Sequence, residues 1–312
     1  MRILVTGGAG YIGCVLVPML LEAGHDVRVL DSLRKGGLGL LPWAANRRLE
    51  LVRGDVRDPA TLREALKGAD VIMHLAAIVG YPACQKDPWL ARTTNVEGTR
   101  NLIQQRSRDQ LIIFPSSLSN YGAVEGQLCT EEMKPQPITL YGVTKVEAEA
   151  LLLETENVIV YRPATAFGLS PQMRLDLLFN EFVYRALKER HLLVYQPHFM
   201  RAFVHVRDFA KAFPFALDNA ERMTGQIYNL GSESANLTKG DLAQRVREKV
   251  DFVLQFAETG EDPDKRDYTV DFSKLRCLGF EADVTIEEGI EEFVRGFPLI
   301  DLPGPFSNTA YV

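Results

Sequence analysis

The first half of the chain alternates short runs of β-branched residues with longer helical patterns. The strand-like runs are RILVT, DVRVL, RLELVRG, ADVIMHLAA and QLIIFPSS, and a long helical pattern covers residues 88–106. This alternation is typical of parallel strands joined by helical crossovers, which place helices on both faces of a sheet. We therefore expect an α/β fold with a doubly wound parallel sheet over residues 1–165. The alternation weakens after NVIVYRPATAFG, so we expect residues 166–312 to form mainly a smaller lobe, part of which returns to the first domain.

A glycine-rich turn, GGAGYIG, joins the first strand to a helical pattern that starts at about Tyr11. Gly8, Gly10 and Gly13 satisfy the pattern GxGxxG, and Gly7 with the last two satisfies GxxGxxG. In such turns glycine lets the backbone approach a pyrophosphate, which then rests on the positive end of the helix. A turn that serves packing alone is the alternative, but the position between the first strand and the first helix favours a Rossmann dinucleotide site.

Aspartates end the next two predicted strands. Asp31 stands where a carboxylate would bind ribose hydroxyls and repel a 2′-phosphate, which favours NAD over NADP. Arg34 and Lys35 follow nearby, and they leave NADP open at this point. Asp55, in RGDVRD, is placed to accept a hydrogen bond from the adenine amino group, with an ordinary turn aspartate as the alternative.

The chain contains two tyrosine–lysine pairs with a spacing of four: Tyr141 with Lys145 in YGVTK, and Tyr184 with Lys188 in NEFVYRALKER. Residues four apart share one face of a helix, so the ammonium can lie beside the phenol. A nearby cation favours the phenolate and would lower the phenol pKa from its ordinary value of about 10, which would produce a general base. The second pair is interleaved with apolar residues, a pattern typical of an ordinary core-facing helix with a solvated lysine.

Composition excludes several classes of protein. A chain of 312 residues with 46% hydrophobic and 24% charged residues is globular and long enough for one large or two moderate domains. Its net charge of −6 argues against a nucleic-acid-binding surface. The four cysteines form no CxxC pair and the histidines show no ligand spacing, so no metal site is predicted. Without a signal stretch or a long apolar run, we expect a cytoplasmic protein with no membrane contact.

The motifs TGGAGYIG, GDV, HLAA, NVEGTRNL, PSSLSNYG and YGVTK stand in this order, and RPATAFG, RAFVHVRDFAKA and IYNLGS follow them. With this ordered set the chain resembles the extended short-chain dehydrogenase/reductase family, and it is similar to nucleotide-sugar epimerases and dehydratases such as UDP-glucose 4-epimerase. The resemblance covers most of the chain. It implies NAD as the cofactor, a substrate-binding C-terminal lobe, and a catalytic YxxxK pair that falls on Tyr141 and Lys145.

The resemblance also assigns the residues that contact the cofactor and a third catalytic residue. The family places a Ser or Thr four residues before the tyrosine of its YG motif, here Tyr121, so the third catalytic residue is Ser117. Its hydroxyl would donate to the substrate oxygen while Tyr141 takes the proton; a turn-capping serine is the alternative. The cofactor-binding residues implied are Gly7, Gly10, Tyr11, Ile12, Gly13, Asp31, Asp55, Val56, Leu75 and Lys145.

One departure from the family narrows the chemistry. Sugar-nucleotide 4,6-dehydratases carry an Asp-Glu pair directly after the catalytic hydroxyl residue, and decarboxylating relatives usually keep a glutamate at the second place. This chain has Leu118 and Ser119 there. The resemblance therefore supports neither elimination, and hydride chemistry at one carbinol carbon remains.

A nucleotide diphosphate needs placed cations in a chain of net negative charge, and the planar fork of arginine suits phosphate. By the resemblance the substrate-binding residues are Arg201, Arg266, Asn180 as a polar contact, and Tyr195 as a base-stacking surface. Arg174 is a further candidate. For each arginine the alternative is an ordinary surface residue, and for Tyr195 it is packing in a short strand.

Four other polar or reactive residues are expected to be structural. His74 and His205 lie in apolar strand patterns and are expected to be hydrogen-bonded core residues. Cys84 is expected to fill a small buried space. Asn95, in TTNVEGT, is expected to tie a helix to a strand.

These patterns predict an NAD-dependent epimerase of a nucleotide-diphosphate sugar that acts at C4 through a transient ketone. A keto-sugar-nucleotide reductase with dissociable cofactor is the nearest alternative, and a catalytically silent NAD-sensing protein is the third. We expect a homodimer formed through the helix that carries the YxxxK pair and the long helix before it; the apolar stripe of VEAEALLLE would also suit internal packing.

Overall fold

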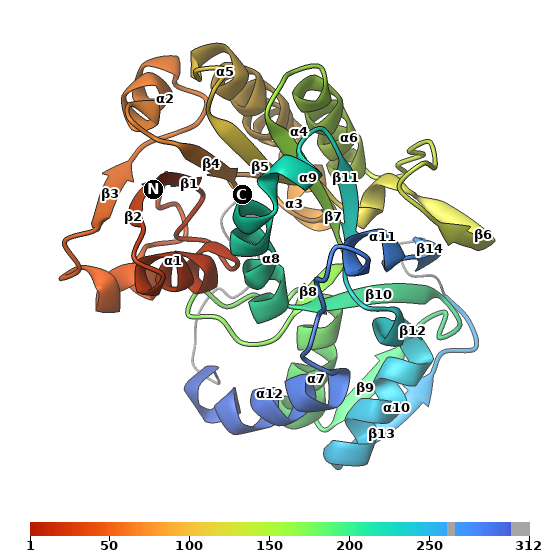
Figure 1. Cartoon of the computed structure of the whole chain (residues 1–312). Helices are drawn as coiled ribbons and strands as arrows, with labels where there is room; N and C mark the ends of the chain where they lie inside the picture. The colour runs from red at the N-terminus through yellow and green to blue at the C-terminus, as the bar shows by residue number, and fades with distance from the viewer. Residues whose placement is uncertain (261–265, 301–312) are drawn as a thin grey trace.

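A seven-stranded parallel sheet forms the centre of the upper part of the molecule as seen in Figure 1. The computed structural model describes residues 1–260 and 266–300. The strand order is β11-β7-β5-β4-β1-β2-β3, in which the chain runs outward from β1 in one direction and then in the other. The strands are β1 (Arg2–Thr6), β2 (Asp26–Asp31), β3 (Leu49–Arg53), β4 (Val71–His74), β5 (Leu111–Pro115), β7 (Val158–Pro163) and β11 (Ile227–Leu230).

Alternate residues of β1 enter two different cores, as the period of two in a strand requires. Ile3 and Val5 pack with helices α1 (Gly13–Glu22) and α8 (Val206–Asp218) on one face. Leu4 packs on the other face, against the helices that carry Leu62, Leu102 and Leu152. Those helices are α2 (Pro59–Leu66), α5 (Gly98–Gln105) and α6 (Leu140–Leu153). The predicted α/β fold with a doubly wound parallel sheet is confirmed.

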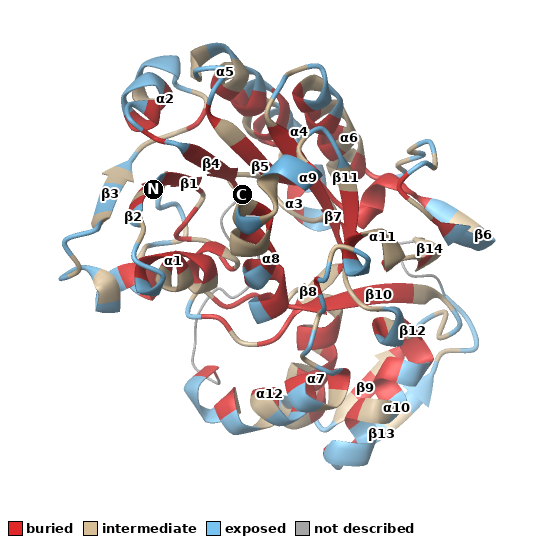
Figure 2. Cartoon of the chain, viewed as in Figure 1, coloured by how far each residue is buried: buried red, intermediate tan, exposed pale blue. Residues whose placement is uncertain are grey.

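Burial follows strand position in the sheet. Every residue of the central strands β4 and β7 is buried, whereas β3 at the edge is mostly exposed, and Leu51 keeps 54% of its surface exposed. Figure 2 shows the buried strands lying between helices whose outer sides are exposed. A parallel sheet covered on both faces requires this near-continuous apolar character.

A second group of elements forms a lobe below the sheet (Figure 1). Its aromatic core includes Phe167, Phe179, Phe203 and Phe293, and the rings of Phe167 and Phe179 lie 4.3 Å apart. Three helices enclose this core: α7 (Leu178–Lys188), α10 (Lys239–Lys249) and α12 (Ile286–Ile300). Its strands are β8 (Thr165–Phe167), β9 (His191–Val194), β10 (Met200–His205), β12 (Asn236–Thr238) and β13 (Val253–Phe256).

Segments from the second half of the chain also belong to the seven-stranded sheet and to the helices that cover it. β11 pairs in parallel with β7, and α8 packs beside α1. Near the junction of the two groups, β6 (Ala123–Cys129) pairs with β14 (Asp267–Val270). Crossings of this kind bring residues far apart in the sequence to the carboxyl ends of the central strands.

The predicted long helix near residues 88–106 is present with one irregularity. It consists of α4 (Pro88–Arg92), a π-helical turn (Thr93–Glu97) and α5. Such single π turns inside helices occur frequently at functional sites. Among residues 1–260 and 266–300, no helix is long and apolar enough to cross a membrane.

Candidate active site

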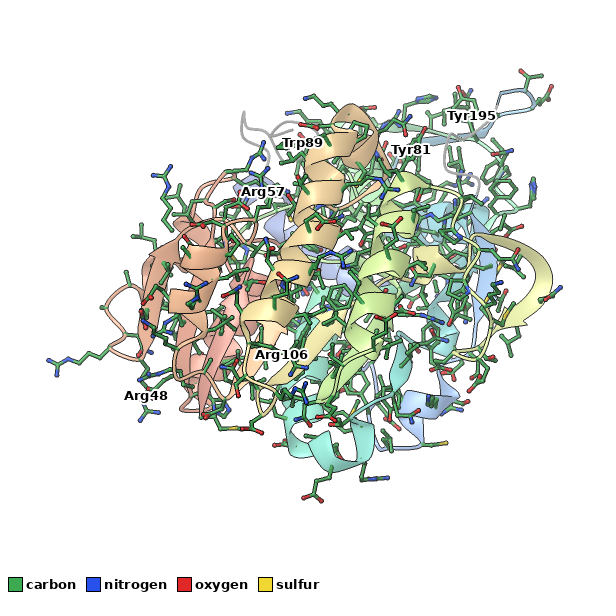
Figure 3. All side chains as sticks on the ribbon, turned by 90° about the horizontal axis from the view of Figure 1, so that it is seen from above. Arg48, Arg57, Tyr81, Trp89, Arg106 and Tyr195 are labelled. Atoms are coloured by element: carbon green, nitrogen blue, oxygen red, sulfur yellow. The ribbon has the colours of Figure 1, made fainter. Side chains whose placement is uncertain are left out.

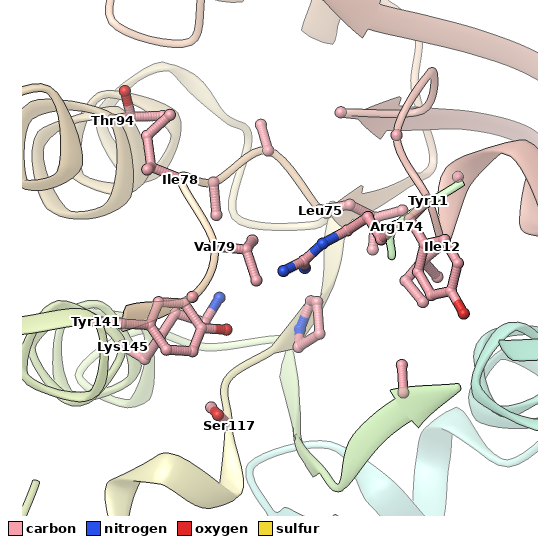
Figure 4. Close-up of a pocket in the computed structure, with 18 of the residues that line it drawn as sticks. Tyr11, Ile12, Leu75, Ile78, Val79, Thr94, Ser117, Tyr141, Lys145 and Arg174 are labelled. Atoms are coloured by element: carbon pink, nitrogen blue, oxygen red, sulfur yellow. The ribbon is translucent and has the colours of Figure 1, made fainter. Parts of the chain in front are cut away.

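The carboxyl ends of the central strands open into one cavity (Figure 4). Such a position, outside the carboxyl ends of the strands of an open α/β sheet, is where ligands bind in doubly wound folds. All of the predicted cofactor-binding and catalytic residues line this cavity. They are Gly7, Gly10, Tyr11, Ile12, Gly13, Asp31, Asp55, Val56, Leu75, Ser117, Tyr141 and Lys145.

The glycine turn between β1 and α1 leaves no room for side chains. Gly7 has a φ of 72°, and a Cβ there would lie 2.7 Å from the backbone nitrogen of Ala76. A Cβ on Gly13 would lie 2.3 Å from the carbonyl oxygen of Gly8. The turn can therefore press against the end of β4 while its backbone faces the cavity at the start of a helix. This arrangement fits the pyrophosphate of a dinucleotide.

The aspartates at the ends of β2 and β3 are held differently. The carboxylate of Asp31 accepts hydrogen bonds from the backbone nitrogens of Ala9 (3.0 Å) and Leu33 (2.8 Å), and burial raises its pKa. The carboxylate of Asp55 accepts from the Arg57 guanidinium, with a shortest distance of 2.6 Å, and this bond lowers the Asp55 pKa. Asp31 is thus hydrogen-bonded to the glycine turn, whereas the carboxylate of Asp55 is paired with the Arg57 guanidinium.

Helix α6 brings the YxxxK pair to the cavity. The hydroxyl of Thr139 accepts a hydrogen bond from the nitrogen of Gly142 at 3.2 Å and caps the helix start. Tyr141 and Lys145 consequently lie in the first turns, and both line the cavity (Figure 4). Tyr184, on α7, packs instead against Phe297 of α12, with the two ring centroids 5.7 Å apart. The structure therefore places Tyr141 and Lys145, and not the second pair, on the cavity wall.

Burial, rather than the neighbouring charges, dominates the ionisation of this pair. It raises the pKa of Tyr141 to about 12, although a hydrogen bond with Ser117 and the charges of Arg174 and Arg266 act in the lowering direction. Burial also lowers the pKa of Lys145 to about 7, against the charge of Glu149. The expected lowering of the phenol pKa is therefore not found in this structure, because desolvation of the phenol outweighs the nearby cations.

Ser117 belongs to a small network of hydroxyl groups. Its Oγ accepts from the backbone nitrogen of Ser119 (3.1 Å) and donates to Ser119 Oγ (3.0 Å). Nη1 of Arg266 donates to the same Ser119 Oγ at 2.7 Å. Arg266, directly before β14, therefore reaches the vicinity of Ser117 and lines the cavity.

Arg174 also projects into the cavity, between the glycine turn and Tyr141 (Figure 4). Asp176 accepts from its guanidinium at 2.6 and 3.2 Å. The ion pair with Asp176 holds the planar guanidinium in a fixed orientation on the cavity wall.

Three of the predicted substrate-binding residues do not line the cavity. Asn180 is buried and ties Tyr11 to the lobe, since its Nδ2 donates to Tyr11 Oη (3.2 Å) and to the carbonyl oxygen of Arg174 (2.8 Å). Arg201 is buried beneath β14, where its guanidinium donates to the carbonyl oxygens of Met200 and Arg266. Tyr195 is 38% exposed and projects from the edge of the molecule (Figure 3). Their positions suit packing and loop support.

The expected structural residues fill those roles. His74 is bonded on both ring nitrogens, to Thr6 Oγ1 (2.7 Å) and Thr99 Oγ1 (3.1 Å), and burial lowers its pKa to about 3. Asn95 bonds both backbone groups of Ile78 and the hydroxyl of Thr144. It thereby ties the π-helical turn to the loop after β4 and to α6. Cys84 is wholly buried. His205 is also buried; its Nδ1 accepts from the backbone nitrogen of Arg207 at 3.2 Å, whereas its Nε2 lies 3.4 Å from Glu292 Oε2.

Residues 3–231 match the NAD dependent epimerase/dehydratase family. The chain belongs to this family. Its members depend on NAD, and the cradle formed by Gly7, Gly13 and Asp31 is the place where this chain would hold that cofactor.

Relatives in this family carry out different reactions. UDP-glucuronic acid decarboxylase 6 of Arabidopsis thaliana is 31% identical, with 96% of this chain and 89% of the relative covered. The dTDP-glucose 4,6-dehydratase of Streptomyces niveus is 29% identical, with 95% and 93% covered. The solved structure of the UDP-glucose 4-epimerase of Thermus thermophilus in complex with NAD is 25% identical, has a TM-score of 0.78, and covers 94% of this chain and 99% of its own. This chain therefore belongs to a family of NAD-dependent nucleotide-sugar epimerases, dehydratases and decarboxylases.

A buried ion pair behind the cavity was not predicted from the sequence. Arg162 on β7 donates to Glu149 on α6 at 2.5 Å, and both side chains are almost fully buried. Asn120 donates to Glu149 (2.9 Å) and to the hydroxyl of Ser116 (3.0 Å). The pair thus joins α6 to the loop that carries Ser117. The signal was the continuation of the spacing of four from Tyr141 and Lys145 to Glu149.

Proposed function

We propose that the chain is an NAD-dependent epimerase of a nucleotide-diphosphate sugar, acting at C4 through a 4-keto intermediate. The observation that carries this proposal is the convergence of Ser117, Tyr141 and Lys145 on the same cavity as the glycine turn. A sugar hydroxyl placed between Ser117 and Tyr141 would meet a hydrogen-bond donor and a proton acceptor at one oxygen.

Each residue would have a separate task. When bound, NAD takes up a hydride from the sugar carbon and can return it. Tyr141 would remove the hydroxyl proton as the ketone forms and return it as the ketone is reduced. Since burial raises the pKa of Tyr141 to about 12, the cations of Lys145, Arg174 and Arg266 would be needed to stabilise the phenolate. Ser117 would hold the oxygen while the ketone turns its other face, which inverts the centre.

The alternative chemistries of the family need groups that the described residues of this cavity do not offer. Elimination of water at C5 and C6 requires an acid and a base beside the sugar. Among the described residues that line the cavity, Asp31 and Asp55 are the only carboxylates, and both lie where the adenosine end of the cofactor would be bound. Leu118 and Ser119 occupy the places of the dehydratase carboxylates, which supports epimerisation over elimination.

A substrate panel tests the proposal. The purified protein is incubated with UDP-, dTDP-, GDP- and CDP-hexoses, and products are identified by NMR while the nicotinamide absorbance is followed. We expect interconversion of C4 epimers without added cofactor and without net change in nicotinamide absorbance. Stoichiometric oxidation of added NADH or NADPH would instead identify a reductase, and the absence of any turnover with retained NAD would favour a sensing role.

We also propose a homodimer formed through α6 and the α4–α5 helix. These helices lie side by side on the surface in Figure 3, and the ion pair between Arg92 and Glu147 (3.0 Å) links them. Trp89, at one end of this face, is 69% exposed, and its ring would supply a large apolar contact to a second copy. Light scattering of the wild type and of Trp89→Glu tests this: a dimer that the substitution dissociates is expected, and a wild-type monomer would contradict it.

A further inference from the structure

Helix α6 carries a third buried polar residue behind the YxxxK pair. Tyr141, Lys145 and Glu149 follow one another at a spacing of four and therefore share one face of the helix. Glu149 is 3% exposed and, unlike the other two, does not line the cavity. A buried carboxylate is costly unless it is paired and hydrogen-bonded. The partners of Glu149 therefore show what this charge holds in place.

One partner connects Glu149 to the loop that carries Ser117. Asn120 is fully buried, and its Nδ2 donates to Glu149 Oε2 at 2.9 Å and to Ser116 Oγ at 3.0 Å. Ser116 directly precedes Ser117, so a hydrogen-bonded path of three side chains joins α6 to this loop. The carboxylate thereby fixes how Ser117 lies relative to Tyr141, and both of these side chains would have to meet the same substrate oxygen.

The other partner fixes the carboxylate itself. Arg162 on β7 donates from Nη2 to Glu149 Oε1 at 2.5 Å, and its Nε lies 3.2 Å from both carboxylate oxygens. Its Nη1 donates to Tyr121 Oη (3.1 Å) and to the carbonyl oxygen of Glu131 (3.3 Å). A guanidinium bound through all three nitrogens is held in one orientation, so it holds Glu149 in one orientation against the sheet.

Glu149 also supplies a charge that opposes the effect of burial on Lys145. Burial lowers the Lys145 pKa to about 7, and the carboxylate of Glu149 acts in the raising direction. His74 on β4 and Cys84 on α3 (Tyr81–Lys86) also interact with this amine. Burial lowers the pKa of His74 to about 3 and raises the pKa of Cys84 to about 12, so both are neutral near pH 7. Glu149 is therefore the ionised partner that favours the ammonium form of Lys145.

We propose that Glu149 is a positioning residue of the reaction: it holds the Ser117 loop in register with Tyr141 and places a negative charge behind Lys145. This inference rests on the proposed function and adds the residue that assembles its catalytic groups. Because Glu149 lies behind the cavity wall, it would act on kcat through these three side chains and leave NAD binding unchanged. An ion pair that only stabilises the fold would instead affect thermal stability and leave the kcat of the folded protein unchanged.

The test variant removes both buried charges. Glu149→Gln alone would leave the Arg162 guanidinium buried without its counter-ion, which destabilises the fold, so Glu149→Gln is combined with Arg162→Met. We expect kcat of this double variant to fall by about 100-fold, the cost of misplacing catalytic groups by about 1 Å, while fluorescence titration shows unchanged affinity for NADH. Arg207→Met combined with Glu292→Gln is the matched control, because it removes an ion pair of 2.6 Å whose members do not line the cavity. The control should lower the melting temperature without lowering kcat.

Coupling with Ser117 separates positioning from general stability. Ser117→Ala should lower kcat by about 100-fold in the wild-type chain, the cost of a lost donor at the reacting oxygen. In the Glu149→Gln/Arg162→Met background the same substitution should add a loss of less than about 10-fold, because Ser117 is already displaced there. Two full losses that multiply, or an unchanged kcat in the double variant with a lower melting temperature, would overturn the positioning role.

A measurement without substrate tests the charge behind Lys145. Relative to Lys145→Met, the free energy of unfolding of the wild type should rise between about pH 6 and about pH 9, since the unfolded chain binds the extra proton in this window. Loss of the Glu149 charge should lower the Lys145 pKa further and enlarge this rise in the double variant, and an equal rise in both backgrounds would overturn the electrostatic role. Lack of turnover by the wild type with every sugar nucleotide would overturn the proposed function and the positioning role together, whereas the unfolding measurement would still decide the placement of the charge.

Discussion

The two ends of the cavity are built in different ways. The phosphate-binding part of the cofactor end is made by one continuous segment, in which the backbone of the turn from Gly7 to Gly13 and the carboxylate of Asp31 are fixed by β1, α1 and β2. The sugar end is assembled from side chains far apart in the sequence, Ser119, Tyr141, Arg174 and Arg266. The first end depends on the absence of side chains and the second on their chemistry. Membership of the family therefore predicts the residues of the cofactor end better than those of the sugar end.

Removal of the phenol hydroxyl should affect the sugar end alone. Tyr141→Phe is expected to lower kcat by about 10²- to 10⁴-fold, the range of a general acid–base group, and to leave NAD binding unchanged. Tyr184→Phe is the matched control, because it alters the other tyrosine of a YxxxK spacing, which packs on Phe297. Equal losses in the two variants would show that the tyrosine acts through the fold.

A methyl group in the glycine turn should break the cofactor end. Gly7→Ala places a Cβ 2.7 Å from the backbone nitrogen of Ala76 and should weaken NAD binding at least about 100-fold, since the pyrophosphate must approach this backbone. Gly225→Ala shares the positive φ but meets no atom within 4 Å. It should cost about 1 kcal/mol of stability without loss of NAD. Fluorescence titration with NADH and thermal unfolding provide both readouts.

The buried amine at the sugar end should destabilise the NAD-free protein in its charged form. The Lys145 pKa falls from 10.5 to about 7 on burial, so the unfolded chain binds more protons between these values. The free energy of unfolding therefore rises with pH in this window. Compared with Lys145→Met, the wild type should gain roughly 2 kcal/mol between about pH 6 and about pH 9.

Denaturant unfolding at the two pH values measures this gain, and Lys188→Met on the other YxxxK pair serves as the control. Parallel pH profiles for Lys145→Met and the wild type would show that Lys145 titrates normally in the folded protein.

The smallest effect concerns the choice of cofactor. Asp31→Asn removes the charge that would repel a 2′-phosphate while Arg34 and Lys35 stay in the cavity wall. We expect the preference for NAD over NADP to fall about 10-fold. Competition binding of the two cofactors measures the ratio, and an unchanged ratio would assign the selectivity to the shape of the cavity.

The sequence predicted what depends on local pattern. The β1–turn–α1 unit and the position of Asp31 follow from periodicity, glycine spacing and the order of strands, and the choice of Tyr141 over Tyr184 follows from the family resemblance. These features are short in range, and the structure places all of these residues except Tyr184 on the cavity wall.

What depends on tertiary placement was not predictable. The sequence does not distinguish the roles of Arg201 and Arg266. In the structure Arg201 is buried against the carbonyl oxygen of Arg266, whereas the side chain of Arg266 lines the cavity. The pKa of Tyr141 was expected to fall because the spacing of Tyr141 and Lys145 can be read from the sequence. The desolvation that raises this pKa depends on the tertiary fold and cannot be read from the sequence. The ion pair of Glu149 and Arg162 likewise exists only once β7 lies beneath α6.

Deuterium at C4 of the sugar nucleotide offers the most direct measurement of the reaction. The labelled substrate, of the nucleotide that binds best, is converted by the NAD-loaded protein in ordinary water and the product is examined by NMR. Removal and return of hydrogen at the same carbon predicts a C4 epimer that keeps its deuterium at C4. Loss of the deuterium to water, or its recovery in a dissociated cofactor, would contradict epimerisation through a transient ketone.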